Sequence, residues 1–395
     1  MKDKIKILST VGLYHALNDG SVAAIPILFP IFKIIFNLSY TQIGIVTGGS
    51  LLIHLISQLI IGRVSDGKNS GTMLSFSILL MSLSMLFLTE AQEYYSLLVL
   101  IFLHRFAASF FHPIGVGWIS RIFKKDRIDW AMGIQSGLAD VGAFIAVLTT
   151  LYLAEITSWE LPLYIWSIAG VVILLIGISL TIKLKDDDLV VKKISARRTI
   201  KETINESTIF LKKIKLLMPA FIISGSSWGL TVTYLPLLLV ERTNLPLSII
   251  GLIVAVWIGI GSISSICYGR ICKSLGRKNV IILSYLIIGI GSLSLSFFTN
   301  VIIIILLMVL LGITVFITFP ALFSIVSEIT HESAVGKTFG TIFTLQLGGG
   351  TLLLFLGGFL SDIYGIWIPF ALLGLITIPF SIVLLANRKK LNVSV

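Results

Sequence analysis

A polar turn between two apolar segments has the sequence Gly62-Arg63-Val64-Ser65-Asp66-Gly67-Lys68-Asn69-Ser70-Gly71. A related turn, Gly269-Arg270-Ile271-Cys272-Lys273-Ser274-Leu275-Gly276-Arg277-Lys278, follows 207 residues later. The same offset relates Pro113 to Pro320. One constant offset across many apolar segments indicates an internal repeat. In membrane proteins such a repeat predicts two halves with the substrate site near the membrane midplane between them.

The composition indicates a membrane protein. Of 395 residues, 56% are hydrophobic and 12% are charged, whereas a soluble domain has about 25% charged residues. We expect an all-α polytopic membrane protein with twelve transmembrane helices in two six-helix pseudo-symmetric halves, residues 1–183 and 214–395, joined by a cytoplasmic linker, residues 184–213. The predicted spans are 7–32, 41–64, 71–89, 94–122, 128–154, 161–183, 214–240, 247–271, 278–298, 300–328, 335–361 and 366–386.

The net charge of +11 follows the predicted topology. With the N-terminus in the cytoplasm, 27 of the 30 Lys and Arg residues lie on the cytoplasmic side, and the exceptions are Lys33, Arg105 and Arg242. The positive-inside rule therefore places both termini in the cytoplasm, and we expect a multi-pass protein of the cell (plasma) membrane. The basic charge gives no reason to expect nucleic acid as a partner.

The two turns and the 6+6 plan resemble the major facilitator superfamily over essentially the whole chain. Its signature turn is Gly-x-x-x-Asp-(Arg/Lys)-x-Gly-(Arg/Lys)-(Arg/Lys). The first copy keeps Gly62 and Asp66, and the second keeps the basic end but has Lys273 in place of the acid. Three stretches resemble the fosmidomycin-resistance branch of efflux proteins: His15-x-x-Asn18-Asp19, Phe36-Asn37-Leu38-Ser39-Tyr40-Thr41-Gln42-Ile43-Gly44 and Phe111-His112-Pro113, although Ile114 follows where we expect an acid.

Asp19 lies near the middle of the first predicted span. A charge at that depth costs at least about 2.5–3.5 kcal/mol on insertion scales, so it needs a partner, a proton or water. An acid there can take up a proton from one side of the membrane and release it to the other, as proton-coupled antiport requires. His15 lies one turn earlier on the same face and is expected to relay the proton or to bond Asp19. The alternative is that Asp19 only joins helices through neighbouring amides.

Arg105 is a cation slightly outside the middle of the fourth span, where it needs a carboxylate partner. Asp19 and Asp140 lie at compatible depths. Either Arg105 switches between an acid and an anionic substrate group, or a permanent Arg105–Asp140 pair merely locks two helices together. The predicted proton-coupling residues are therefore Asp19, His15, Arg105, Asp140 and His112.

The resemblance implies that spans 1, 4, 7 and 10 line the cavity and that spans 2, 5, 8 and 11 flank it. Polar and aromatic side chains on these spans are the predicted substrate-binding residues: Asn18, Arg105, Trp228, Tyr234, Trp257, Thr318 and Gln346. The ionisable groups lie in the first half, and the second half offers aromatic and weakly polar surface. This asymmetry predicts a first half that couples to protons and a second half that holds an amphipathic ligand.

A separate set of residues is predicted to control gating. Asp66 lies at the cytoplasmic mouth, where the family's turn braces the outward-facing state and an acid is able to cap a helix N-terminus. The proline pair that shares the repeat offset removes backbone hydrogen bonds within its helices. The predicted gating residues are Asp66, Gly62, Arg270, Pro113 and Pro320.

The leading hypothesis is a secondary active transporter working by alternating access, with proton-coupled efflux of a small amphipathic compound or drug. The alternatives are proton-coupled uptake of an organic anion held by Arg105, and a lipid or amphiphile flippase of the same fold. The sequence has no nucleotide-binding loop, metal-ligand cluster or nucleophile–base pair, so we expect neither an enzyme nor a cofactor or metal. The expected partners are a small-molecule substrate, protons and the lipid bilayer, and we expect a monomer.

Overall fold

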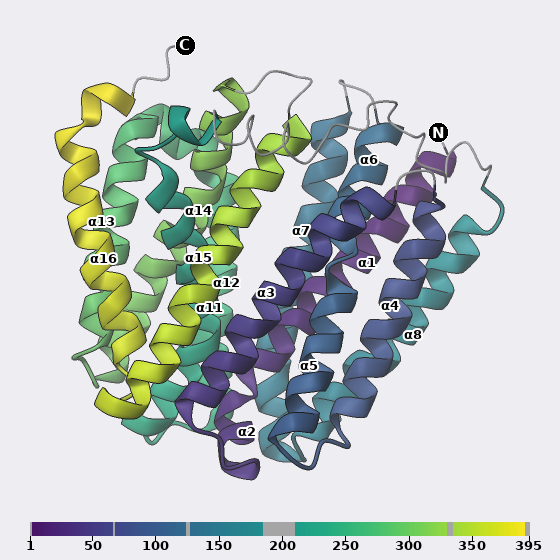
Figure 1. The fold of residues 1–395 in the computed structure, drawn as a ribbon, viewed down its shortest axis with the longest axis horizontal. Helices are drawn as coiled ribbons and strands as arrows, with labels where there is room; N and C mark the ends of the chain where they lie inside the picture. Colours follow the sequence, from purple (N-terminus) through teal and green to yellow (C-terminus); the bar gives the residue numbers. More distant parts are fainter. Residues whose placement is uncertain (1, 66–67, 124–126, 185–209, 330–334, 392–395) are drawn as a thin grey trace. The chain divides into compact units, whose positions relative to one another are not determined.

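The computed structural model describes residues 2–65, 68–123, 127–184, 210–329 and 335–391, and within these ranges it is helical without strands (Figure 1). The first half contains α1 (Lys2–Ile27), α2 (Phe29–Ile35), α3 (Tyr40–Val64), α4 (Ser70–Leu88), α5 (Tyr94–Ala108), a π-helical turn (His112–Val116), α6 (Gly117–Ile122), α7 (Ile128–Ile156) and α8 (Glu160–Thr181). The second half contains α11 (Met218–Arg242), α12 (Leu247–Leu275), α13 (Arg277–Leu295), α14 (Val301–Ile329), α15 (Val335–Tyr364), α16 (Ile368–Ala386) and a 3-10 turn (Arg388–Leu391).

Eleven helical segments of the described ranges are long and apolar enough to cross a bilayer, and the number is twelve if α1 and α2 form one broken span. These two helices meet at an angle of 47° around Leu28. Pro26 and Pro30 flank the bend, and proline has no backbone N–H to donate to a helix. The expected all-α fold with twelve spans is confirmed.

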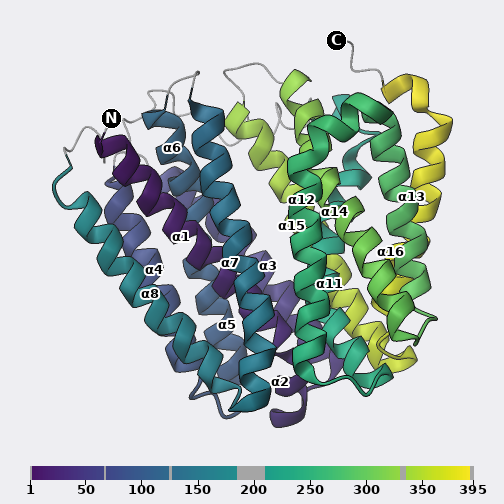
Figure 2. The same cartoon turned by 180° about the vertical axis from the view of Figure 1, so that it is seen from behind.

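The chain divides into two compact units. Unit 1 comprises Met1–Leu38, Gly49–Ala196 and Pro246–Ala255, and unit 2 comprises Ser39–Gly48, Arg197–Leu245 and Val256–Val395. The units therefore differ from the predicted halves at two places, because α3 contributes its beginning to unit 2 and α12 contributes its beginning to unit 1. Within unit 1, α4 and α8 lie side by side, and within unit 2, α13 lies beside α16 (Figures 1 and 2).

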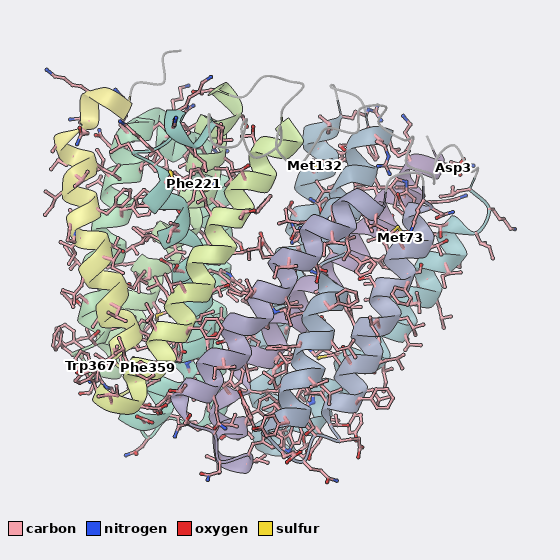
Figure 3. The ribbon with its side chains drawn as sticks, in the orientation of Figure 1. Asp3, Met73, Met132, Phe221, Phe359 and Trp367 are labelled. Atoms are coloured by element: carbon pink, nitrogen blue, oxygen red, sulfur yellow. The ribbon has the colours of Figure 1, made fainter. Side chains whose placement is uncertain are left out.

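Alternate spans run in the same direction within each unit, as a polytopic chain requires. Asp3, Met73 and Met132 each lie in the first turns of a helix and appear toward one end of unit 1 (Figure 3). In unit 2, Phe221 near the start of α11 lies toward one end, whereas Phe359 near the end of α15 lies toward the other (Figure 3).

In unit 1, α1 and α7 touch backbone to backbone. A Cβ atom on Gly142 of α7 would collide with the carbonyl oxygen of Ala16 on α1. Lipid tails are as apolar as leucine, so helices in a membrane associate by such close packing at small residues. Unit 2 has a similar contact between its corresponding helices, where Gly225 of α11 meets the backbone of Gln346 on α15.

We predict that Gly142→Ala destabilises the protein by about 1–3 kcal/mol, because the added methyl group forces α1 and α7 apart. Gly137→Ala on the same helix is the matched control, since a Cβ atom there meets nothing within 4 Å. The control is expected to be neutral or stabilising by up to about 1 kcal/mol, as alanine favours a helix over glycine. Thermal unfolding of both purified variants measures the difference. Equal stability of the two variants would contradict the close contact.

Two carboxylates cap the beginnings of α3 and α12. Asp362 accepts hydrogen bonds from the backbone N–H groups of Tyr40 and Thr41, each at 2.8 Å, within unit 2. Glu155 accepts one from the backbone N–H of Ser248 at 2.7 Å, within unit 1. The repeat offset of 207 relates Glu155 to Asp362 and Thr41 to Ser248, so the two caps are equivalent. A carboxylate satisfies the unpaired N–H groups of a helix N-terminus and interacts favourably with the helix dipole.

We predict that Asp362→Ala speeds amide hydrogen exchange at Tyr40 and Thr41 and leaves Ser248 unchanged, and that Glu155→Ala has the reverse effect. Each variant is expected to lose about 0.5–2 kcal/mol, the usual cost of removing a helix cap. Mass spectrometry of peptides spanning residues 36–48 and 244–255 measures both effects in one experiment. Unchanged exchange at the capped amides in either variant would show that its carboxylate is not the cap.

Candidate functional site

His15 of α1 is held by Gln135 of α7. Its Nδ1 atom lies 2.6 Å from Gln135 Oε1 and 3.1 Å from the Gln135 backbone oxygen. A backbone carbonyl only accepts hydrogen bonds, so Nδ1 carries the N–H. The Gln135 side-chain Nε2 donates to Ser136 Oγ at 2.8 Å, so the amide oxygen Oε1 is the atom that faces His15. The remaining ring nitrogen, Nε2, therefore presents a lone pair whenever the imidazole is neutral.

The lone pair of His15 faces the carboxylate of Asp19. The distance from His15 Nε2 to Asp19 Oδ2 is 3.5 Å, and Nε2 is buried with no hydrogen-bond partner among the described residues. Asp19 is held by its neighbour, because Asn18 Nδ2 donates to Asp19 Oδ1 at 2.8 Å. About a third of the Asp19 side chain, 35%, is exposed, against 6% for His15. Two acceptors thus face each other, one on a buried side chain and one on a partly exposed side chain.

Aromatic rings surround this pair. Phe111 stacks on the His15 ring with centroids 4.1 Å apart. The His112 ring meets His15 edge-on at 5.4 Å, and His54 of α3 lies 6.3 Å from His112. His112 and Pro113 begin the π-helical turn, and π turns inside transmembrane helices often mark functional sites. The fourth span therefore supplies two of the rings around His15.

Arg105 of α5 belongs to the same group of charges. Asp19 lies within electrostatic range of its guanidinium, and His54 and His112 lie within range of the same carboxylate. Asp140 lies at an exposed position of α7. Of the predicted proton-coupling residues, the structure thus gathers Asp19, His15, Arg105 and His112 around one point in unit 1.

One atom each from His15, Asp19 and His112 lies within 4.8 Å of the others, which meets the distance condition for a metal ion. His15 also donates its other N–H to an oxygen, as metal-bound histidines do. The positive charge of Arg105 acts on the same carboxylate and opposes a doubly charged ion. The arrangement therefore favours a proton or another single positive charge over a divalent metal.

Comparison with known proteins decides the family. The model of the Major Facilitator Superfamily matches residues 11–354, with a second match over residues 217–394. The chain belongs to the Major Facilitator Superfamily. It is therefore a multi-pass membrane protein and a membrane transport protein.

Two superfamily relatives are similar in sequence. An uncharacterized MFS-type transporter YfnC from Bacillus subtilis (strain 168) is 29% identical over 109 residues, and this match spans only 28% of this chain and 27% of that relative. An uncharacterized MFS-type transporter MJ1560 from Methanocaldococcus jannaschii is 22% identical over 332 residues, covering 82% of this chain and 83% of the relative.

Solved superfamily structures share the fold. The nucleoside transporter NupG matches with a TM-score of 0.76 at 13% identity, covering 98% of this chain and 100% of that one. The peptide transporter POT in complex with sulfate matches with a TM-score of 0.77 at 14% identity, covering 98% of this chain and 94% of that one. At this level of identity the likeness concerns the fold alone.

In unit 2, two predicted substrate-binding residues form structural hydrogen bonds. The Tyr234 hydroxyl donates to the Leu354 backbone oxygen at 2.7 Å and is fully buried. Thr318 Oγ1 lies 2.8 Å from Ser224 Oγ, which lies 2.7 Å from the Tyr285 hydroxyl. Both groups join helices of unit 2, and the hydroxyl protons of Tyr234 and Thr318 are already donated to backbone oxygens.

Two other predicted residues of unit 2 keep buried donors. The Trp257 ring meets the Phe316 ring edge-on, with the ring centroids 5.0 Å apart. The Trp257 Nε1 has no hydrogen-bond partner among the described residues. Gln346 Nε2 is also buried without a hydrogen-bond partner among the described residues. Trp228 is half-buried on α11. Trp257 and Gln346 thus remain the better candidates in unit 2 for a ligand that accepts hydrogen bonds.

The predicted gating residues are only partly described. Asp66 lies outside the described residues. Gly62 is next to the π-helical turn, since a Cβ atom on it would lie 3.6 Å from Pro113 Cβ. Pro320, the repeat partner of Pro113, lies inside the unbroken helix α14, and Arg270 is exposed on α12. The two prolines therefore have different effects on their helices.

Gln135 and His54 are members of the site that the sequence analysis did not predict. His54 shares a helix face with Gln58 at four-residue spacing, which by itself indicates only helix packing. Gln135 is a polar residue within the long apolar helix α7. A polar amide at such a position indicates an interhelical hydrogen bond.

We predict that Arg105→Gln destabilises the protein by roughly 1–3 kcal/mol, because it leaves the Asp19 carboxylate without its cation in a membrane protein. Adding Asp19→Asn is expected to restore most of the loss, whereas adding Asp140→Asn is not. Thermal unfolding of the single and double variants gives the coupling energy of each pair. Rescue by Asp140→Asn instead of Asp19→Asn would identify the other acid as the partner.

Proposed function

We propose that this chain is a secondary active transporter that works by alternating access and exports a small amphipathic compound in exchange for protons. The observation that carries the proposal is the pair of facing acceptors, His15 Nε2 and Asp19 Oδ2, 3.5 Å apart. Two lone pairs at this distance repel each other unless a proton or another donor lies between them. A proton shared by the pair removes this repulsion.

The surroundings of the His15–Asp19 pair support reversible binding of a proton. Histidine is the side chain that ordinarily changes charge between pH 5 and 8, and the Asp19 side chain is 35% exposed, so water is able to deliver a proton. Arg105 acts on the same carboxylate. The site thus places an acid, a histidine and a fixed cation within one cluster.

The remaining features of the proposal come from the sequence. Residues 1–183 and 214–395 would be the two halves that alternate, with residues 184–213 as a cytoplasmic linker. Both termini would lie in the cytoplasm of a cell whose plasma membrane holds the protein, and one chain would suffice. Uptake of an organic anion by Arg105 is less well supported, because the guanidinium already interacts with Asp19.

Transport of radiolabelled propranolol, an amphipathic secondary amine, into proteoliposomes with an acidic lumen tests the proposal. The native protein is expected to accumulate the compound in the acidic lumen faster than protein-free liposomes do, and Asp19→Asn to abolish this difference, since it removes the group that binds the proton. Asp3→Asn is the matched control because Asp3 lies exposed on the same helix and pairs with Lys6 at the surface. Accumulation by Asp19→Asn equal to the native protein, or native accumulation that ignores the pH gradient, would overturn the proposal.

A further inference from the structure

The geometry points to a protonated amine as the group exchanged for the proton, so that the substrate is an organic ammonium ion carrying at least one N–H. This inference rests on the proposed function, because it names the substrate class of the same site. It is carried by the hydrogen-bonding character of three atoms on one face of α1, at residues 15, 18 and 19.

All three atoms are acceptors. His15 Nε2 is an acceptor because Nδ1 carries the proton to Gln135. Asn18 uses its Nδ2 to donate to Asp19 Oδ1, which leaves Asn18 Oδ1 buried with no partner among the described residues. Asp19 Oδ2 is a carboxylate oxygen. An ammonium nitrogen is a donor with up to three N–H groups and no acceptor. Its N–H groups match acceptors of this kind, whereas a deprotonated carboxylate or phosphate offers them no donor.

Buried acceptors without partners are costly, and they are rare in folded proteins. Here two of them, on His15 and Asn18, adjoin a carboxylate that is 35% exposed. The Phe111 ring stacked on His15 adds an aromatic face, against which the apolar part of an amine packs and to which a cation is attracted. A hydrophobic amine thus finds both a charge partner and an apolar surface.

Charge sets the sign of the pH dependence. The groups that act on the Asp19 carboxylate are His15 on α1, His54 on α3, Arg105 on α5 and His112 in the π-helical turn. Protons that enter this group occupy the acceptors and add positive charge. Acid therefore weakens the binding of an ammonium ion, and the amine leaves on the more acidic side.

Labelling of Asp19 by dicyclohexylcarbodiimide tests the inference in the purified full-length protein. This reagent modifies protonated carboxyl groups in apolar surroundings, and mass spectrometry of the peptide spanning residues 7–32 measures the yield. The yield at Asp19 is expected to fall as pH rises. At an intermediate pH, benzylamine is expected to protect Asp19 at a concentration about tenfold lower than benzyltrimethylammonium, which has the charge but no N–H. Benzyl alcohol and phenylacetate are expected to give no protection.

The outcomes separate the two proposals. Labelling that depends on pH but is not reduced by benzylamine leaves the proton site in place and overturns the amine. Equal protection by benzylamine and benzyltrimethylammonium overturns the amine too, since charge alone then suffices, and so does stronger protection by phenylacetate. Absence of Asp19 labelling at every pH, or labelling that ignores pH, overturns the proposed proton site and the amine with it.

Two variants of α1 test whether Asn18 contributes to the protection of Asp19 by benzylamine. Asn18→Ala removes one of the three acceptors together with the donor to Asp19 Oδ1, so benzylamine is expected to protect about tenfold less well, while the yield still falls as pH rises. Ser21→Ala is the matched control, because among the described residues the Ser21 hydroxyl bonds the Asn18 backbone oxygen of its own helix alone, at 3.1 Å, and is buried as well. Equal protection in Asn18→Ala and Ser21→Ala would overturn the assignment of Asn18 to the amine.

Discussion

The backbones of α1 and α7 meet at Ala16 and Gly142, with no room between them for a side chain. This contact brings Gln135 within hydrogen-bonding reach of His15 on the neighbouring helix. The hydrogen bond puts the imidazole proton on Nδ1, and the free lone pair is thereby turned toward Asp19. The tautomer of the neutral His15 ring is therefore a consequence of helix packing, and a wider spacing of the two helices would allow either tautomer.

The spans of this protein were predictable because lipid allows few solutions: each long apolar segment has to satisfy its own backbone hydrogen bonds as a helix. The breaks within spans were harder to predict. Pro113 and Pro320 occupy equivalent positions of the repeat, yet the first lies in a π-helical turn and the second inside an unbroken helix. Proline removes one donor in both places, and the neighbouring residues decide whether the helix adapts or opens.

The site was predictable where it is local. His15 and Asp19 share one helix face at four-residue spacing, so their contact follows from the geometry of the helix. Arg105 had two candidate acids at similar depth, and depth says nothing about the rotation of each helix about its axis. Only tertiary packing distinguishes Asp19 from Asp140, and the same packing brings His54 to His112. Tertiary packing likewise determines that the Tyr234 hydroxyl donates to a backbone oxygen of α15, which the sequence alone does not show.

The two carboxylate caps have a consequence for how the sequence is able to vary. At each cap the acceptor is a side chain, whereas the donors are backbone N–H groups of Tyr40, Thr41 and Ser248. Any residue except proline supplies such a donor. Mutation is therefore free to rewrite the beginnings of α3 and α12 while the acids at positions 155 and 362 stay constrained. The repeat offset relates the two caps. An ancestral single repeat that formed a dimer would therefore have needed only one such acid, because each copy would have supplied the cap for the other.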